Sequence, residues 1–100
     1  MTALRIEITD DAQAQIAAAA TWWAEHRPSV SGAVVEDLDR ILALLCVQPA
    51  MGTRARRAKL SGVRRITLSR IGYYVYYRVA DEALQVLAFW HTSRGRGPSL

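Results

Sequence analysis

The chain has 100 residues, a length that suits a single domain over residues 1–100 with one core. Apolar residues make up 51% and charged residues 22%, the balance of a soluble globular protein. One cysteine, Cys46, excludes an internal disulfide, and no segment approaches the ~20 apolar residues that a membrane span needs. Because the N-terminus shows no signal-peptide pattern, the sequence predicts a cytoplasmic protein.

Charge is distributed unevenly along the chain. Residues 1–53 hold three arginines and seven acids, a net charge of −4, whereas residues 54–100 hold ten lysines or arginines and two acids, a net charge of +8. Such asymmetry gives a molecule an acidic part and a strongly basic part. We expect the basic part to attract a polyanion or an acidic protein.

The N-terminal third predicts a strand followed by a helix. Residues 3–9 alternate between apolar and polar side chains, as a half-buried strand does. Thr9 and Asp10 offer N-cap chemistry, and the alanine-rich segment 12–27 favours a helix. Trp23 shares the apolar face, whereas Trp22 lies about 100° around the helix and is harder to bury on the same side.

A second helix is predicted after Pro28, which ends the first one. Ser29 or Ser31 can cap it, and Pro49 stops it. Because only a few residues separate the two helices, they should form an antiparallel hairpin. Its core face carries apolar residues at helical spacing: Val34, Leu38, Ile41, Leu42 and Leu45.

Residues 50–62 predict a loop with cations and no acid. Arg54, Arg56, Arg57 and Lys59 lie within it. Two interpretations remain open at this point: a solvated loop, or part of a basic binding surface.

The segments 63–71, 73–79 and 84–91 read as three strands joined by hairpins, which form an antiparallel meander. The sequence therefore predicts an α+β fold of order β-α-α-β-β-β, with the helical hairpin packed on an antiparallel sheet. Strand alternation places Val75 and Val79 against the helices, and leaves the facing of the last strand ambiguous. The same alternation collects four residues on an open face: Arg65, Tyr74, Tyr76 and Arg78.

An open face of arginine and tyrosine has two functional interpretations. It can contact phosphates and bases, or it can serve as a protein interface, since both residue types are enriched at hot spots. The structural alternative is that the tyrosines cap the core and the arginines keep the sheet soluble.

The C-terminal half also matches a family pattern. The pattern is a glycine, an arginine pair, a tyrosine-rich strand ending in arginine, and an apolar strand closing on His-x-x-Arg. These places are taken by Gly62, Arg64, Arg65, Tyr76, Tyr77, Arg78, His91 and Arg94. In order and spacing the chain resembles the RelE/ParE superfamily of type II toxin–antitoxin toxins.

The resemblance implies a small cytoplasmic growth inhibitor that a cognate antitoxin neutralises. In the ParE-like branch the target is DNA gyrase, which is bound without catalysis. In the RelE-like branch the toxin cuts mRNA on the ribosome without a metal, which needs cations and a proton-transfer group. No metal or cofactor is expected, because one cysteine and two distant histidines make no metal site.

Site residues follow from the same resemblance. A nuclease would use Arg65, Arg78 and His91, but the second and third strands lack a carboxylate, and Thr92 stands where some nuclease members carry a tyrosine. We therefore favour gyrase binding. The expected target-binding residues are Arg64, Arg65, Tyr76, Arg78, His91 and Arg94, and the expected antitoxin-binding residues are Trp22, Trp23, Leu38 and Ile41.

The tail at 92–100 contains two glycines, a proline and two arginines, a composition that suits turns. A frayed terminus is the default for such a segment. Arg94 is assigned to the target surface because it follows the last strand directly, and the role of Arg96 is left open.

Overall fold

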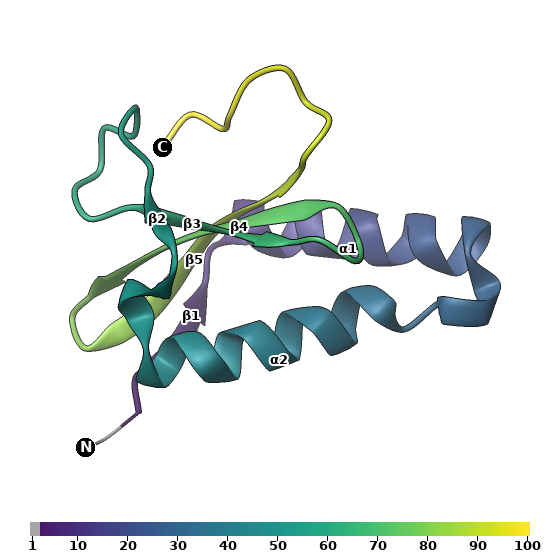
Figure 1. The fold of residues 1–100 in the computed structure, drawn as a ribbon, viewed down its shortest axis with the longest axis horizontal. Helices are drawn as coiled ribbons and strands as arrows, with labels where there is room; N and C mark the ends of the chain where they lie inside the picture. Colours follow the sequence, from purple (N-terminus) through teal and green to yellow (C-terminus); the bar gives the residue numbers. More distant parts are fainter. Residues whose placement is uncertain (1–2) are drawn as a thin grey trace.

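The structure is a computed structural model that describes residues 3–100 (Figure 1). Its elements are, in chain order, β1 (Arg5–Ile8), α1 (Asp10–His26), the 3-10 turn η1 (Pro28–Val30), α2 (Ala33–Val47), the 3-10 turn η2 (Pro49–Met51), β2 (Thr53–Arg54), β3 (Arg64–Leu68), β4 (Tyr73–Ala80) and β5 (Ala83–His91). Two helices pack on a five-stranded sheet, so the predicted α+β class is confirmed.

The sheet has the strand order β1-β5-β4-β3-β2. The β3-β4-β5 meander is antiparallel as predicted. Two details differ: β1 pairs with β5 in parallel, and the short β2 adds an edge strand, so the sheet is mixed rather than wholly antiparallel. Alternation along a strand indicates which of its faces is buried. It does not indicate which strand lies beside it or whether the two run parallel, and here the helical hairpin between β1 and the meander sets both.

Helix α1 begins where its cap predicts. The hydroxyl of Thr9 accepts a hydrogen bond from the Ala12 amide at 3.1 Å, and Asp10 and Asp11 place negative charge in the first turn. The helix therefore starts at Asp10, slightly earlier than expected, and ends at His26 before Pro28.

Helix α2 buries the predicted face but starts differently. Leu38, Leu42 and Leu45 are buried, and Ile41 is partly buried against the same core. The expected serine cap is wrong, because Gly32 is the N-cap residue and no side chain caps the helix. The 3-10 turn η1 occupies the linker and places the serines before the first turn.

The sheet is covered on both faces. Figure 1 shows the loop after β2 and the C-terminal tail on the opposite side of the sheet from α2. Beneath this loop and tail lies a second core, which we call the outer core: the buried residues are Val63, Tyr76, Leu87 and Ala88, with Ala55, Ala58, Tyr74, Trp90 and Leu100 packed against them.

A β-bulge determines which side chains of β5 point toward the helices and which toward the outer core. The register passes from Tyr76 opposite Ala88 to Tyr77 opposite Val86, so Leu87 is an extra residue on β5. Val86 packs in the helix-side core, whereas Leu87 packs in the outer core. This interruption of the two-residue period is why alternation alone left β5 ambiguous.

The placement of Val79 differs from the prediction. It shares the strand face of Val75, yet it is 47% exposed while Val75 is fully buried. Val79 lies near the end of β4, beyond Tyr77, the last residue of β4 that pairs with β3, so no β3 residue flanks it.

Candidate functional site

His91 closes β5 with one ring nitrogen already engaged. The backbone amide of Ser93 donates to His91 Nδ1 at 3.1 Å, and the Ser93 hydroxyl lies 2.7 Å from the same atom. Since a backbone amide only donates, Nδ1 is an acceptor, and the proton of the neutral ring sits on Nε2. The ring meets that of Tyr73 edge to face, with 5.0 Å between centroids.

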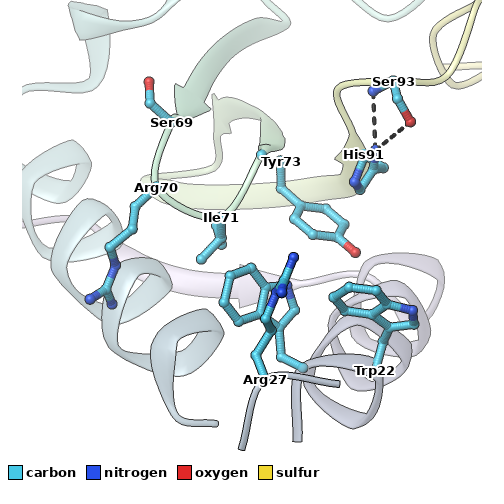
Figure 2. Close-up of a pocket in the computed structure, with 10 residues that line it drawn as sticks. Trp22, Arg27, Ser69, Arg70, Ile71, Tyr73, His91 and Ser93 are labelled. Atoms are coloured by element: carbon cyan, nitrogen blue, oxygen red, sulfur yellow. Dashed lines mark hydrogen bonds between the residues drawn. The ribbon is translucent and has the colours of Figure 1, made fainter. Parts of the chain in front are cut away.

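A pocket of about 620 Å³ opens beside His91, between the end of α1 and the β3–β4 turn (Figure 2). Tyr73 and His91 enter it from the sheet, and Trp22 and Arg27 from the helix side. Burial raises the pKa of Tyr73, and the nearby Arg94 partly offsets this. The volume and the aromatic lining of the pocket suit an apolar or aromatic group of a partner.

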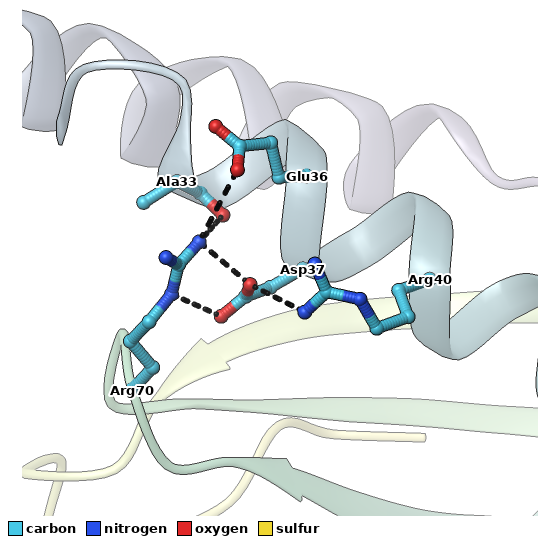
Figure 3. Close-up of polar contacts among 5 residues, drawn as sticks. All are labelled: Ala33, Glu36, Asp37, Arg40 and Arg70. Atoms are coloured by element: carbon cyan, nitrogen blue, oxygen red, sulfur yellow. Dashed lines mark hydrogen bonds and ion pairs between the residues drawn. The ribbon is translucent and has the colours of Figure 1, made fainter.

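Arg70 borders this pocket but directs its guanidinium to α2 (Figure 3). Its nitrogens lie 2.7 and 3.1 Å from the two carboxylate oxygens of the buried Asp37, which Arg40 also approaches at 3.4 Å. Glu36 lies 3.7 Å away. Asp37 raises the pKa of Arg70 mainly by this hydrogen bond. The cluster ties the β3–β4 turn to α2.

Arg65 and Tyr76 face the other side of the sheet. The Arg65 guanidinium stacks over the ring of Tyr74 at 4.2 Å from its centroid. Tyr76 was expected on an open face, but it is only 7% exposed because the outer core buries it. Periodicity places Tyr76 on this face correctly and carries no information about the loop and tail that cover it.

Arg78 belongs to a polar ladder that crosses three strands. Its Nε donates to the side-chain oxygen of Gln85 at 2.9 Å, and the Gln85 amide donates to Glu7 at 3.1 Å. Glu7 also pairs with Arg5 at 3.2 Å. The pKa of Glu7 is lowered, first by the hydrogen bond from Gln85 and then by that from Arg5.

The two remaining predicted target residues make different contacts. Arg64 donates to the carbonyl oxygens of Gly52 at 2.7 Å and Ala50 at 3.4 Å, which holds the loop after α2 against β3. Arg94 stacks over the ring of Trp90 at 3.8 Å from its centroid and is exposed.

The six residues predicted to bind the target therefore do not form one cluster. His91 pairs in register with Tyr73, whereas Arg78 pairs with Gln85, five residues further along β4. At ~3.3 Å per residue this separates them by roughly 16 Å along the strand. Arg65 lies on the opposite face of the sheet from Tyr73, against which His91 packs.

Among the residues predicted to bind the antitoxin, exposure varies. Trp22 is 44% exposed and stacks on His26 with 4.5 Å between ring centroids. Trp23 and Ile41 are partly buried in the helix-side core. Leu38 is 6% exposed, so it serves the core and leaves no surface for a partner.

The site prediction omitted Arg54 at the end of β2 and two arginines of the loop that follows. Arg54, Arg56 and Arg57 converge with Arg65 and Arg96 around one groove. Their density in the sequence was the available signal, but only the fold shows that the tail returns to meet them.

Among residues 3–100, no three His, Cys, Asp or Glu side chains gather closely enough to hold a metal ion. Neither helix in the described range has the length and apolar character to cross a membrane.

Comparisons with known proteins agree with this fold. Residues 6–95 match a family model described as the ParE toxin of the type II toxin–antitoxin system parDE. No curated protein matches the chain significantly. The fold is similar to that of a solved structure described as the chromosomal ParDE TA system from P. aeruginosa, with a TM-score of 0.72 and 22% identity over 90% of this chain and 97% of the other. Because the family model spans most of its length, the chain belongs to the ParE toxin family of type II toxin–antitoxin systems.

Proposed function

We propose that this toxin inhibits bacterial growth by binding DNA gyrase, and that a cognate antitoxin neutralises it. Membership of the ParE toxin family supports the gyrase target over mRNA cleavage. Gyrase acts in the cytoplasm, so the proposal places the toxin there. The observation that carries the choice is that Arg65, Arg78 and His91 do not converge on one point.

Cleavage of RNA at the ribose 2′-hydroxyl needs a proton-transfer group within hydrogen-bond reach of the substrate and cations around the developing phosphorane. Arg78 and His91 are separated by roughly 16 Å along β4 and cannot serve one phosphate. His91 Nδ1 is already an acceptor for Ser93, so Nε2 of the neutral ring carries the proton and cannot act as a general base. Both points favour binding without catalysis.

For the gyrase contact we propose the exposed side chains at the end of β5. Arg94 and His91 both reach solvent there, and Arg65 presents its stacked guanidinium on the outer face. Arg64 and Tyr76 support the fold instead, because the first bonds backbone carbonyls and the second is buried.

For the antitoxin we propose the face of α1 that carries Trp22, together with the pocket between Trp22 and His91. Trp22 is a large exposed apolar side chain, and the pocket has aromatic walls. Exposed aromatic residues around a pocket are typical anchors for an amphipathic segment.

The test compares purified toxin in two assays run in parallel: supercoiling by gyrase, and cleavage of mRNA on translating ribosomes. We expect loss of supercoiling and intact mRNA. Arg94→Ala should relieve the inhibition at least 10-fold, while removing its stacking on Trp90 should cost only ~0.5–1 kcal/mol of folding stability.

Arg5→Ala is the matched control, because it removes one exposed arginine from the other end of the sheet. It should inhibit gyrase as the wild type does. Supercoiling that stays intact at saturating toxin, together with cut mRNA, would overturn the proposal.

A further inference from the structure

A basic groove lies on the outer face of the sheet, and we call it the arginine groove. It holds about 370 Å³ and is lined by five arginines, Arg54, Arg56, Arg57, Arg65 and Arg96, with Tyr76 among the remaining lining residues. No aspartate or glutamate lines it. The two cation-rich stretches of the sequence, the loop after β2 and the tail, thus meet at one place.

Among the described residues, these five arginines have no carboxylate partner, although Arg65 stacks on Tyr74. Arg5, Arg40 and Arg70 each pair with a carboxylate. Arg78 bonds Gln85, and Arg64 bonds backbone carbonyls. Within residues 3–100, no carboxylate lies within ion-pair distance of any of the five groove arginines. Charge that has no partner inside the molecule is concentrated in the groove.

The framework that carries the groove arginines is well packed. The Ala55 amide donates to the Val63 carbonyl at 2.9 Å, and the Lys59 amide donates to the backbone oxygen of Leu100 at 2.6 Å. The indole of Trp90 donates to the Arg96 carbonyl at 2.8 Å. Because the outer core lies directly beneath, the loop and the tail are fixed relative to each other, and the five side chains start from held backbone positions.

Five like charges around one hollow favour an anion with several negative groups. Guanidinium groups match phosphate by paired hydrogen bonds, and each phosphate neutralised by a cation releases condensed counterions. We propose that the arginine groove binds the phosphodiester backbone of nucleic acid, namely the DNA that gyrase holds, so this inference rests on the proposed function.

The lining also indicates how DNA is held. No Asn, Gln, Ser or Thr side chain lines the groove, and Tyr76 is almost completely buried at its floor. Contacts to phosphate fix position without reading bases, so binding should be independent of sequence. Ala55, Ala58, Pro98 and Leu100 also line the groove, so the choice of DNA over an acidic peptide rests on the five guanidinium groups, which suit phosphate.

The direct test measures fluorescence anisotropy of a labelled DNA duplex of arbitrary sequence, titrated with the full chain at several salt concentrations. The test variant is Arg56→Gln/Arg57→Gln. We expect its affinity to fall about 10-fold or more at low salt. The slope of log K against log salt should drop by about two, because each phosphate that an arginine no longer neutralises lowers it by about 0.9.

The matched control is Arg5→Gln/Arg27→Gln, which removes the same charge from arginines outside the groove. It should keep the wild-type slope, and both variants should keep the wild-type melting temperature. Equal losses of affinity in the two variants would overturn the proposal, because binding would then follow net charge alone. Tighter binding to an RNA duplex than to the DNA duplex would overturn the assignment to DNA.

The gyrase assay separates this inference from the proposed function. Wild-type toxin that inhibits supercoiling but does not bind the free duplex at low salt would overturn the groove proposal and leave the gyrase target standing. Toxin that binds DNA through the groove but leaves supercoiling intact would overturn the gyrase target and the assignment to gyrase-held DNA, and would support the groove as a phosphodiester site.

Discussion

At the scale of single residues, Tyr77 connects the sheet to the loop after α2. Its hydroxyl accepts from the Gly52 amide at 2.9 Å and donates to the Pro49 carbonyl at 2.7 Å, in a side chain that is fully buried. Tyr77→Phe would leave both backbone groups without a partner, at a cost of about 1–3 kcal/mol in the free energy of unfolding. Urea unfolding measures this, and an unchanged midpoint would show that water replaces the hydroxyl.

Gly52 has no room for a side chain beside Tyr77. A Cβ there would lie 2.5 Å from the Tyr77 hydroxyl and 2.9 Å from the Arg65 carbonyl. Gly52→Ala should therefore destabilise by about 1–3 kcal/mol through overpacking. Gly95→Ala is the matched control, since no atom lies within 4 Å of its added Cβ. A chemical denaturation curve for each variant tests the difference, which should disappear if η2 can move away.

The buried tyrosines also predict how stability depends on pH. Burial raises the pKa of Tyr77 above its ordinary value of 10.0, although the Gly52 amide and Arg64 lower it in part. The neutral form is favoured in the fold, so this contribution is fully present below pH 10 and is lost as the pH rises above it. Wild type should lose stability more steeply than Tyr77→Phe between about pH 9 and 11, measured by urea unfolding; parallel curves would contradict the prediction.

At the scale of elements, the cluster around Asp37 ties the β3–β4 turn to α2. Arg70→Ala would leave a buried carboxylate with only Arg40, whereas Asp37→Ala would leave Arg70, whose side chain is 51% exposed, in water. We therefore expect Arg70→Ala to lower Tm at least as much as Asp37→Ala, and the double variant to lower it by less than the sum. Additive losses in the double-variant cycle would show that the pair does not interact.

The elements themselves were predictable wherever one local pattern decides them. Residues of α2 repeat at helical spacing, Thr9 caps α1, and β3 alternates, so these elements and their buried faces follow from short windows. The parallel partner of β1 and the extra residue Leu87 depend on contacts between distant segments. No local pattern encodes them.

The candidate site was harder to predict for the same reason. The family pattern groups three arginines of β3 and β4, but each makes a different contact. Arg64 bonds a backbone carbonyl, Arg65 stacks on Tyr74, and Arg78 bonds Gln85. The groove joins Arg56 to Arg96, forty residues later, only because the tail packs on the loop after β2. Charge asymmetry predicted that a basic surface exists, and only the tertiary fold shows its place.

At the scale of the whole molecule, two cores lie on opposite faces of one sheet, and the tail completes the smaller one. Leu100 packs on the outer core, and the Arg96 carbonyl accepts from the Trp90 indole. If these contacts together contribute about 2 kcal/mol, a chain ending at Arg94 should lose roughly 8–16 °C in Tm. Its far-UV circular dichroism should stay helical, because the helix-side core does not involve the tail.

The shortened chain should also bind a hydrophobic dye such as ANS, since it uncovers the outer core around Tyr76 and Leu87. Full-length Ser99→Ala is the control, because Ser99 is exposed and packs in neither core. It should melt as the wild type does and bind no dye. If the shortened chain behaves like this control, the loop after β2 is enough to cover the outer core without the tail. The tail then contributes charge to the groove but does not stabilise the fold.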